Sequence, residues 1–189
     1  MKINLSILLV ISIVLVSYSC KQSNDKISKS MNDSVLIIYF CGNVEFNISQ
    51  TFESMSKNVA LKSYPSEKLH VSHREFAMLK KIVHEFKELK GGEKLESCDS
   101  RMYIKMGSIE FCIGDNNCVC NAKENISIKN LKSIYFIKSL SGYYDFFSKD
   151  DLLNDQGVIK FGLPKDYLRH FRLTNKFPKE EFKKLVICE

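Results

Sequence analysis

The strongest structural signal in this sequence is an amphipathic helix predicted over residues 72–89. Ser72 and Glu75 have the spacing of a capping box, in which the hydroxyl accepts a hydrogen bond from the third helical N–H and the carboxylate reaches back to the cap. Gly91 and Gly92 are expected to end the helix. Apolar residues recur at helical spacing and form one stripe, made of Phe76, Leu79, Ile82 or Val83, Phe86 and Leu89. Because this stripe needs an apolar partner, we expect the helix to lie across a sheet.

Several other segments have the composition of strands. Residues 35–41 are apolar, with β-branched and aromatic side chains, which predicts a buried strand. Residues 44–48 alternate between apolar and polar side chains, so a second extended segment is expected there. Residues 102–106, 109–113 and 118–121 are separated by turn-forming residues, which predicts a three-stranded antiparallel meander.

Helices are predicted in the last third of the chain. Apolar residues between 128 and 138 have helical spacing, and Gly142 is placed to end that helix, although a strand over 133–137 also fits. A proline in the first turn favours a last helix over residues 177–182. A further helix is expected after Ser148, which has cap spacing to Asp151.

The order of these elements predicts the fold class. Strands are followed by a helix, then by hairpins and then by helices, which is typical of an α+β fold and not of an alternating parallel fold. We therefore expect an antiparallel sheet with one long amphipathic helix packed across it and smaller C-terminal helices. Residues 50–64 are ambiguous between helix and strand.

Residues 1–20 have the three parts of a secretory signal: a charged start, an apolar run over 3–16 and small residues before Cys20. The sequence Ser17-Tyr18-Ser19-Cys20 resembles the lipobox of bacterial lipoproteins, although leucine is most usual where Ser17 stands. The resemblance implies that residues 1–19 are a cleaved signal peptide and that Cys20 is acylated and anchors the chain to a membrane. The alternatives are an uncleaved membrane helix, for which the run is at the short limit, and a buried core helix.

The polar segment over residues 20–33 is expected to be a flexible tether, because it cannot bury enough apolar surface to offset its ordering entropy. Lys21 and the mixed charges that follow resemble the surface-export signals of Bacteroidota lipoproteins. This resemblance implies a place at the outer membrane of the cell envelope. Residues 34–189 have the size of a single domain.

The charge pattern does not favour a nucleic-acid partner. The chain has a net charge of +6, but acidic residues stand beside basic ones, and there are four arginines: Arg74, Arg101, Arg169 and Arg172. A nucleic-acid-binding domain concentrates lysine and arginine on one face. We therefore expect no nucleic acid among the partners.

Six cysteines besides Cys20 are the first candidates for chemistry. An even number in an oxidising compartment favours disulfides, and six cysteines leave fifteen connectivities open. Even-numbered hairpin loops are common, and such a loop over 114–117 would place Cys118 opposite Ile113. We therefore expect no bond between Cys112 and Cys118.

Two alternative interpretations of the cysteines remain. Cys118 and Cys120 could be a redox pair, or they could bind a metal together with Cys112 and a histidine. Zinc sites usually separate paired cysteines by two to four residues and contain two such pairs, and the sequence shows neither feature. We expect structural disulfides or buried thiols, with no metal and no cofactor. The histidines are scattered, which predicts a surface role for His70, His73, His84 and His170.

One aromatic cluster is a candidate contact surface. Tyrosine and phenylalanine rings carry much buryable area, and tyrosine is common among interface anchors. The alternative is that the rings close the core beneath the preceding helix. The cluster follows Gly142 and consists of Tyr143, Tyr144, Phe146 and Phe147.

No recognisable catalytic motif accompanies these features: the sequence has no glycine-rich phosphate loop, nucleophile elbow, zinc-protease motif or calcium loop. We expect a non-enzymatic lipoprotein of the cell envelope, anchored through Cys20, that binds another protein. The alternative is a lipid-anchored hydrolase or thiol enzyme, which would place a cysteine or carboxylate beside a histidine in a cleft.

Overall fold

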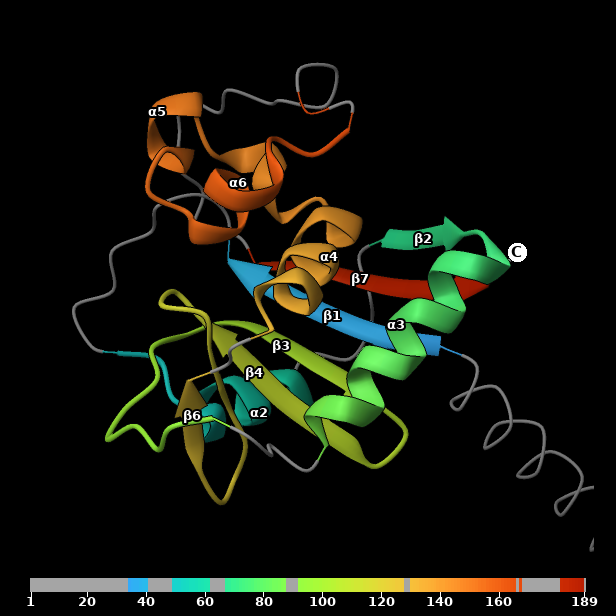
Figure 1. The fold of residues 1–189 in the computed structure, drawn as a ribbon. Coiled ribbons are helices and arrows are strands. Elements are labelled where there is room, and N and C mark those ends of the chain that lie inside the picture. The colour runs from blue at the N-terminus through green and yellow to red at the C-terminus, as the bar shows by residue number, and fades with distance from the viewer. Residues whose placement is uncertain are drawn as a thin grey trace, which may run out of the picture.

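The protein has an α+β fold built on one seven-stranded sheet (Figure 1). The structure is a computed structural model that describes residues 34–40, 49–61, 67–87, 92–127, 130–165, 167 and 181–188. The strand order is β2-β7-β1-β3-β4-β5-β6, and every neighbouring pair is antiparallel except β2 and β7, which are parallel. The strands are β1 Ser34–Phe40, β2 Glu67–Val71, β3 Ser100–Met106, β4 Ile109–Gly114, β5 Cys118–Cys120, β6 Asn125–Ser127 and β7 Glu181–Cys188.

Helices cover both faces of the sheet. Figure 1 shows α3 and α4 in front of the strands and α2 behind them. The C-terminal helices are short and follow α4 directly in the chain. The helical elements are α2 Phe52–Leu61, α3 His73–Phe86, α4 Leu131–Ser141, the 3-10 helix η1 Tyr143–Phe146, α5 Lys149–Leu152 and α6 Gln156–Phe161. Within the described ranges, no helix combines the length and the apolar character needed to cross a bilayer.

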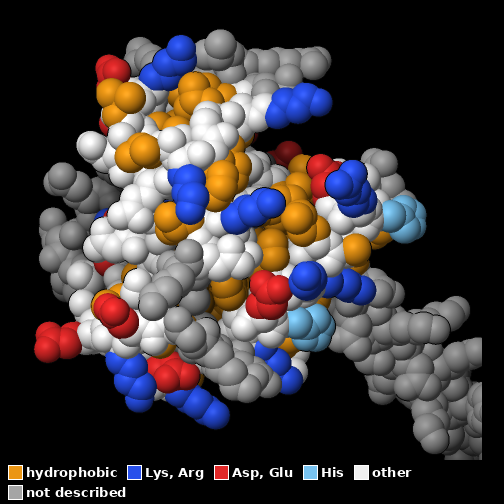
Figure 2. Space-filling view, viewed as in Figure 1, with side chains coloured by type: hydrophobic (Ala, Val, Ile, Leu, Met, Phe, Trp, Pro, Cys, Tyr) orange, Lys and Arg blue, Asp and Glu red, His pale blue; other side chains and the backbone are white. Residues whose placement is uncertain are grey.

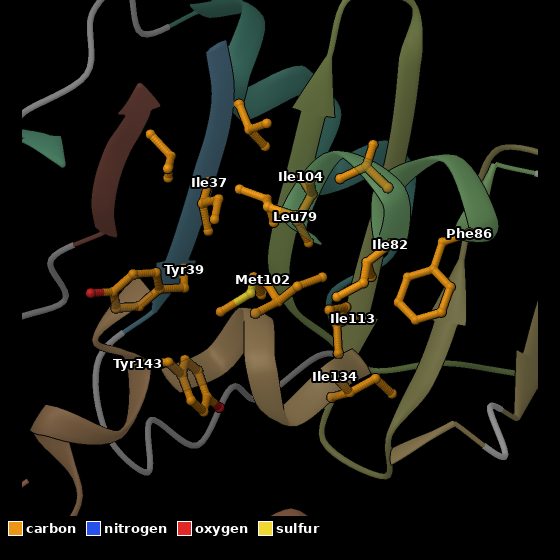
Figure 3. Close-up of a cluster of buried hydrophobic side chains, with 14 of the residues drawn as sticks. Ile37, Tyr39, Leu79, Ile82, Phe86, Met102, Ile104, Ile113, Ile134 and Tyr143 are labelled. Atoms are coloured by element: carbon orange, nitrogen blue, oxygen red, sulfur yellow. The ribbon is translucent and has the colours of Figure 1, made fainter. Parts of the chain in front are cut away.

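Successive side chains along each strand point to opposite faces of the sheet, and this alternation creates two cores. In β1, Ile37 and Tyr39 face the larger core, which is filled by α3 and α4, whereas Ile38 faces the smaller core under α2. Figure 3 shows the larger core, where Leu79 and Phe86 of α3 meet the sheet. The smaller core contains four cysteines: Cys98, Cys112, Cys118 and Cys120.

The amphipathic helix is confirmed, with a shorter C-terminal end than expected. Ser72 caps α3, its hydroxyl accepts from the Glu75 backbone N–H, and the Glu75 carboxylate accepts from Ser72 N at 3.0 Å. The helix ends at Phe86 with Lys87 as its cap, before the two glycines that were expected to stop it. The predicted stripe is buried, apart from Leu89, which lies outside the described residues; its buried members are Phe76, Leu79, Ile82, Val83 and Phe86.

The helix over the 128–138 segment is also confirmed as α4. Gly142 ends it with a φ of 73°, a left-handed conformation that glycine adopts without steric cost. The strand alternative at 133–137 is wrong. Ser148 forms the expected capping box with Asp151 and begins α5.

The prediction of a last helix over 177–182 is wrong for residues 181 and 182, because these two residues begin β7. Residues 177–180 lie outside the described residues. β7 pairs with β1 along its length and with β2 on its other side, so it is a central strand of the sheet. This long-range pairing outweighs the local helix-start signal.

The structure shows a helix in one of the two remaining segments, residues 50–64, and does not describe the other, residues 44–48. The ambiguous residues 50–64 contain α2, whose Met55 packs into the smaller core. The extended segment expected over 44–48 lies outside the described residues, as do the signal peptide 1–19 and the tether 20–33.

The predicted meander forms, with a different register in its second hairpin. Cys112 pairs with Cys120 and Ile113 pairs with Val119, so three residues connect β4 to β5. The expected even-numbered loop is therefore wrong. The three-residue loop is possible because Asn117, its last residue, adopts a φ of 55°.

Candidate functional site

The aromatic cluster predicted as a contact surface lies largely in the core. Tyr143, Tyr144 and Phe147 are buried, and Phe146 is partly buried and packs against the same core. The Tyr39 ring of β1 lies 5.7 Å from the Tyr143 ring in an edge-on arrangement. The alternative interpretation is the correct one for the buried rings: the turn at Gly142 brings the chain back over the sheet, and they close the core beneath α4.

These rings also position α6. The Tyr144 hydroxyl donates to Asp155 Oδ1 at 3.1 Å, and the same oxygen accepts from Val158 N at 2.9 Å, which caps α6. Burial, followed by the Asp155 charge, raises the pKa of Tyr144, so the phenol stays protonated and donates. Lys138 of α4 forms an ion pair with the other Asp155 oxygen. α6 is therefore fixed to α4 by a buried polar network.

An apolar groove lies between α5 and α6, with a volume of about 300 Å³. Leu152 and Val158 form its inner part. Leu153 and Ile159 line it while each keeps 67% of its surface exposed. Leu163 completes the lining and is also exposed. We call this feature the α5–α6 groove. Its volume is at the lower end of the range for ligand-binding clefts.

Short helices explain why these side chains are exposed. α5 and α6 have four and six residues, and neighbouring helical residues point in different directions. Leu152 and Val158 turn toward the core, so Leu153 and Ile159 cannot do the same. Tyr135 holds the end of α6, because its hydroxyl donates to Gly162 O at 2.9 Å.

Charged side chains accompany the α5–α6 groove. Lys149 lines it, and Lys160 and Lys165 are exposed in the α6 segment and just after it. Figure 2 shows hydrophobic side chains gathered over α5 and α6 at the upper left, with basic and acidic side chains at the edges of the patch. Of the two exposed carboxylates on α5, Asp151 accepts hydrogen bonds in the capping box. The groove thus has an apolar floor, and Lys149 is the one charged side chain among the described residues that line it.

The cysteines divide into a disulfide and a thiol pair. Cys98 is bonded to Cys118, which agrees with the expectation of no Cys112–Cys118 bond. Cys112 and Cys120 are buried free thiols. Cys188 is partly exposed at the end of β7, and Cys41 and the predicted lipidation site Cys20 lie outside the described residues.

The histidines and carboxylates form no metal site in the part of the chain that the structure describes. No group of three or more histidine, cysteine, aspartate or glutamate side chains there is placed to hold a metal ion. His70, His73 and His84 are exposed, and His170 lies outside the described residues. No histidine lines the α5–α6 groove or the two polar hollows beside α2, so the cleft expected for a hydrolase is not found among these described hollows.

Sequence reasoning missed the α5–α6 groove, although a signal was present. Leu152 and Leu153 are adjacent, as are Val158 and Ile159, and each pair falls in a segment with helix-cap spacing. Two adjacent residues on a short helix cannot both face one core. An exposed apolar side chain on each helix could therefore have been predicted. Comparisons of the chain with models of known protein families, with curated proteins and with solved structures find no match.

Proposed function

We propose that the chain is a lipid-anchored protein of the cell envelope that binds another protein, without catalysis, through the α5–α6 groove. The observation that carries this proposal is the exposure of Leu153 and Ile159, 67% each, beside a groove in which a buried network fixes α6 to α4. Exposed apolar side chains that line a concave surface with a polar rim are typical of interaction sites. A rigid groove also costs little conformational entropy on binding.

The chemistry of the groove favours one kind of partner. The floor takes aliphatic or aromatic side chains, and the exposed lysines at positions 149, 160 and 165 favour carboxylates. We expect a protein segment that presents one or two apolar anchors flanked by aspartate or glutamate. A concave site suits a side chain that enters it better than it suits a flat lipid surface.

Two features support an envelope location. The first is the lipobox-like sequence ending at Cys20, which implies an anchor at a membrane. 

The second feature is the Cys98–Cys118 disulfide, because disulfides persist in oxidising compartments outside the cytosol. An acylated Cys20 followed by a polar tether would hold the groove near the membrane while leaving it accessible to a partner. The predicted outer-membrane location rests on the resemblance of residues 20–33 to surface-export signals.

Selection from a random-peptide display library tests the proposed binding. The full chain, with Cys20→Ser to prevent acylation, is the bait, and a second bait carries Leu153→Asp and Ile159→Asp. We expect the first bait to enrich peptides that combine apolar and acidic residues, and the second bait to lose them. Both substitutions are at exposed positions, so they should change the free energy of unfolding by less than about 1 kcal/mol in total.

Peptide binding by these baits is compared with that of a control variant, and vesicles test whether the groove binds a membrane instead. Met78 is 42% exposed on α3, away from the groove lining, so Met78→Asp should leave peptide binding unchanged. Vesicles of anionic phospholipid are the alternative occupant. If the groove substitutions weaken vesicle binding and no peptide is enriched, the groove is a membrane contact and the proposal is wrong.

A further inference from the structure

Two buried thiols face each other under α2. Cys112 on β4 is paired directly with Cys120 on β5 in the antiparallel register, and both side chains lie in the smaller core. Their side chains are 0% and 1% exposed. Directly opposed residues in an antiparallel pair have Cβ atoms about 4.5–5.5 Å apart, so a small adjustment brings two cysteine sulfurs to bonding distance.

The surroundings of the pair concentrate sulfur and hydroxyl groups at one place. Ser100 Oγ lies 3.2 Å from Cys120 Sγ. The Cys98–Cys118 disulfide lies over Gly114, where a Cβ atom would overlap Cys118 Sγ and lie 2.8 Å from Cys98 Sγ. The missing side chain at position 114 therefore makes room for the disulfide, which joins the segment just before β3 to β5.

We propose that Cys112 and Cys120 are a thiol–disulfide exchange site that closes a second, cross-strand disulfide by reaction with a small disulfide of the glutathione class. Cys120 is the attacking residue and Cys112 is the resolving residue. This site is separate from the α5–α6 groove, and the inference does not depend on the proposed binding function.

The exchange balances in two steps. The Cys120 thiol loses its proton to the buffer, and its thiolate attacks one sulfur of the small disulfide, forming a mixed disulfide and releasing one small thiolate. That thiolate takes the proton of the Cys112 thiol. Cys112 then attacks Cys120 Sγ, forms the cross-strand bond and releases a second small thiolate, which takes a proton from the buffer. The two cysteines lose two electrons, and the small disulfide is reduced to two thiols.

The two thiols have different electrostatic environments, which assigns their roles. The neighbouring Cys112 thiol lowers the pKa of Cys120, whereas burial raises the pKa of Cys112. Ser100 is placed to donate to the Cys120 thiolate. Since the thiolate is the nucleophile, Cys120 reacts first.

Access to the pair is controlled by α2. Met55 of α2 packs in the same small core as both thiols. A hollow of about 240 Å³ beside α2 reaches Cys98, with Glu53 in its lining. Because the thiols themselves are covered, the exchange proceeds when α2 opens locally, and loosening α2 should accelerate it.

The experiment equilibrates the full chain in glutathione buffers ranging from fully reduced to fully oxidised. Acid stops the exchange, N-ethylmaleimide labels the remaining thiols under denaturing conditions, and tryptic peptides are weighed. Peptide 106–123 carries Cys112 and Cys120 together with Cys118 of the existing disulfide, so fragment ions assign the label on each cysteine. We expect these two cysteines to carry maleimide at the reduced end and to carry neither maleimide nor glutathione at the oxidised end. Retention of both labels at the oxidised end would overturn the proposal.

Single substitutions test the order of attack. Cys112→Ser should trap glutathione on Cys120, whereas Cys120→Ser should trap about tenfold less on Cys112 in the same time. Equal trapping would contradict the assigned roles. Met55→Ala should speed closure in the wild-type pair by about tenfold. If a serine variant does not fold, shown by loss of its far-UV circular dichroism, the labelling of the wild-type pair decides the proposal alone.

Discussion

Lys138 Nζ lies 3.2 Å from Asp155 Oδ2, and this ion pair joins α4 to the residue that caps α6. Lys138 is only 3% exposed, and its ammonium group also lies 5.2 Å from the centre of the Tyr143 ring. A buried ammonium group needs such partners, because its removal from water is costly. The pair thus links the core to the helix that presents Ile159.

Asp155→Ala should destabilise the protein by about 3 kcal/mol, because it leaves the Lys138 charge buried and removes the cap of α6. Urea denaturation measures the free energy of unfolding. The double variant Lys138→Met with Asp155→Asn is the matched comparison: it removes both charges and keeps a side chain that can cap α6, so the loss should be about 1 kcal/mol or less. Equal losses in the two variants would show that the buried charge does not determine the cost.

Phe86→Ala should cost about 3–5 kcal/mol, because the ring is buried against the sheet and lies edge-on to Phe111, with ring centres 5.5 Å apart. The exposed Met78 on the same helix provides the control. Met78→Ala should change the free energy of unfolding by less than about 0.5 kcal/mol. A loss below about 1 kcal/mol for Phe86→Ala would mean that α3 packs through another face.

Gly114→Ala should destabilise the protein by about 1–3 kcal/mol, because the new methyl group would overlap Cys118 Sγ and lie 2.6 Å from Asp99 O. Thermal unfolding followed by circular dichroism measures the loss. Asn116→Ala, at an exposed position in the neighbouring turn, is the control and should have little effect. If both variants unfold at the wild-type temperature, the disulfide does not lie over Gly114.

Cys20→Ser should abolish acylation when the chain is expressed in a bacterium and labelled with a palmitate analogue. The lipobox-like residues before Cys20 are the reason for this expectation. Cys41→Ser is the control, and it should be labelled as strongly as the wild type. Equal labelling of Cys20→Ser and wild type would contradict the predicted anchor.

The sequence predicts elements whose determinants are local. The capping box and the apolar stripe that define α3 lie within the helix, and Gly142 lies at the end of α4. β7 could not be predicted in this way. β7 pairs with β1 and β2, which are far from it in the sequence. This pairing outweighs a local sequence pattern that favours a helix.

The candidate site was less predictable than the fold, because exposure depends on packing. Tyr143 and Leu153 are both apolar side chains near helix ends, yet Tyr143 is buried against Tyr39 and Leu153 is exposed. The pairing of Cys112 with Cys120 depends on the number of residues in the hairpin loop. An even-numbered loop would place Cys118 opposite Ile113 instead. Such differences are decided by the three-dimensional contacts of the chain.

The most direct test of the proposed function is the affinity of one enriched peptide for the wild-type protein and for Ile159→Asp, measured by fluorescence anisotropy. If Ile159 is a central contact in the α5–α6 groove, its replacement by a charged residue should raise the Kd by about 30-fold or more, which corresponds to about 2 kcal/mol. Met78→Asp should leave the Kd unchanged. An unchanged Kd for Ile159→Asp, in a variant that keeps the wild-type unfolding temperature, would contradict binding through the groove.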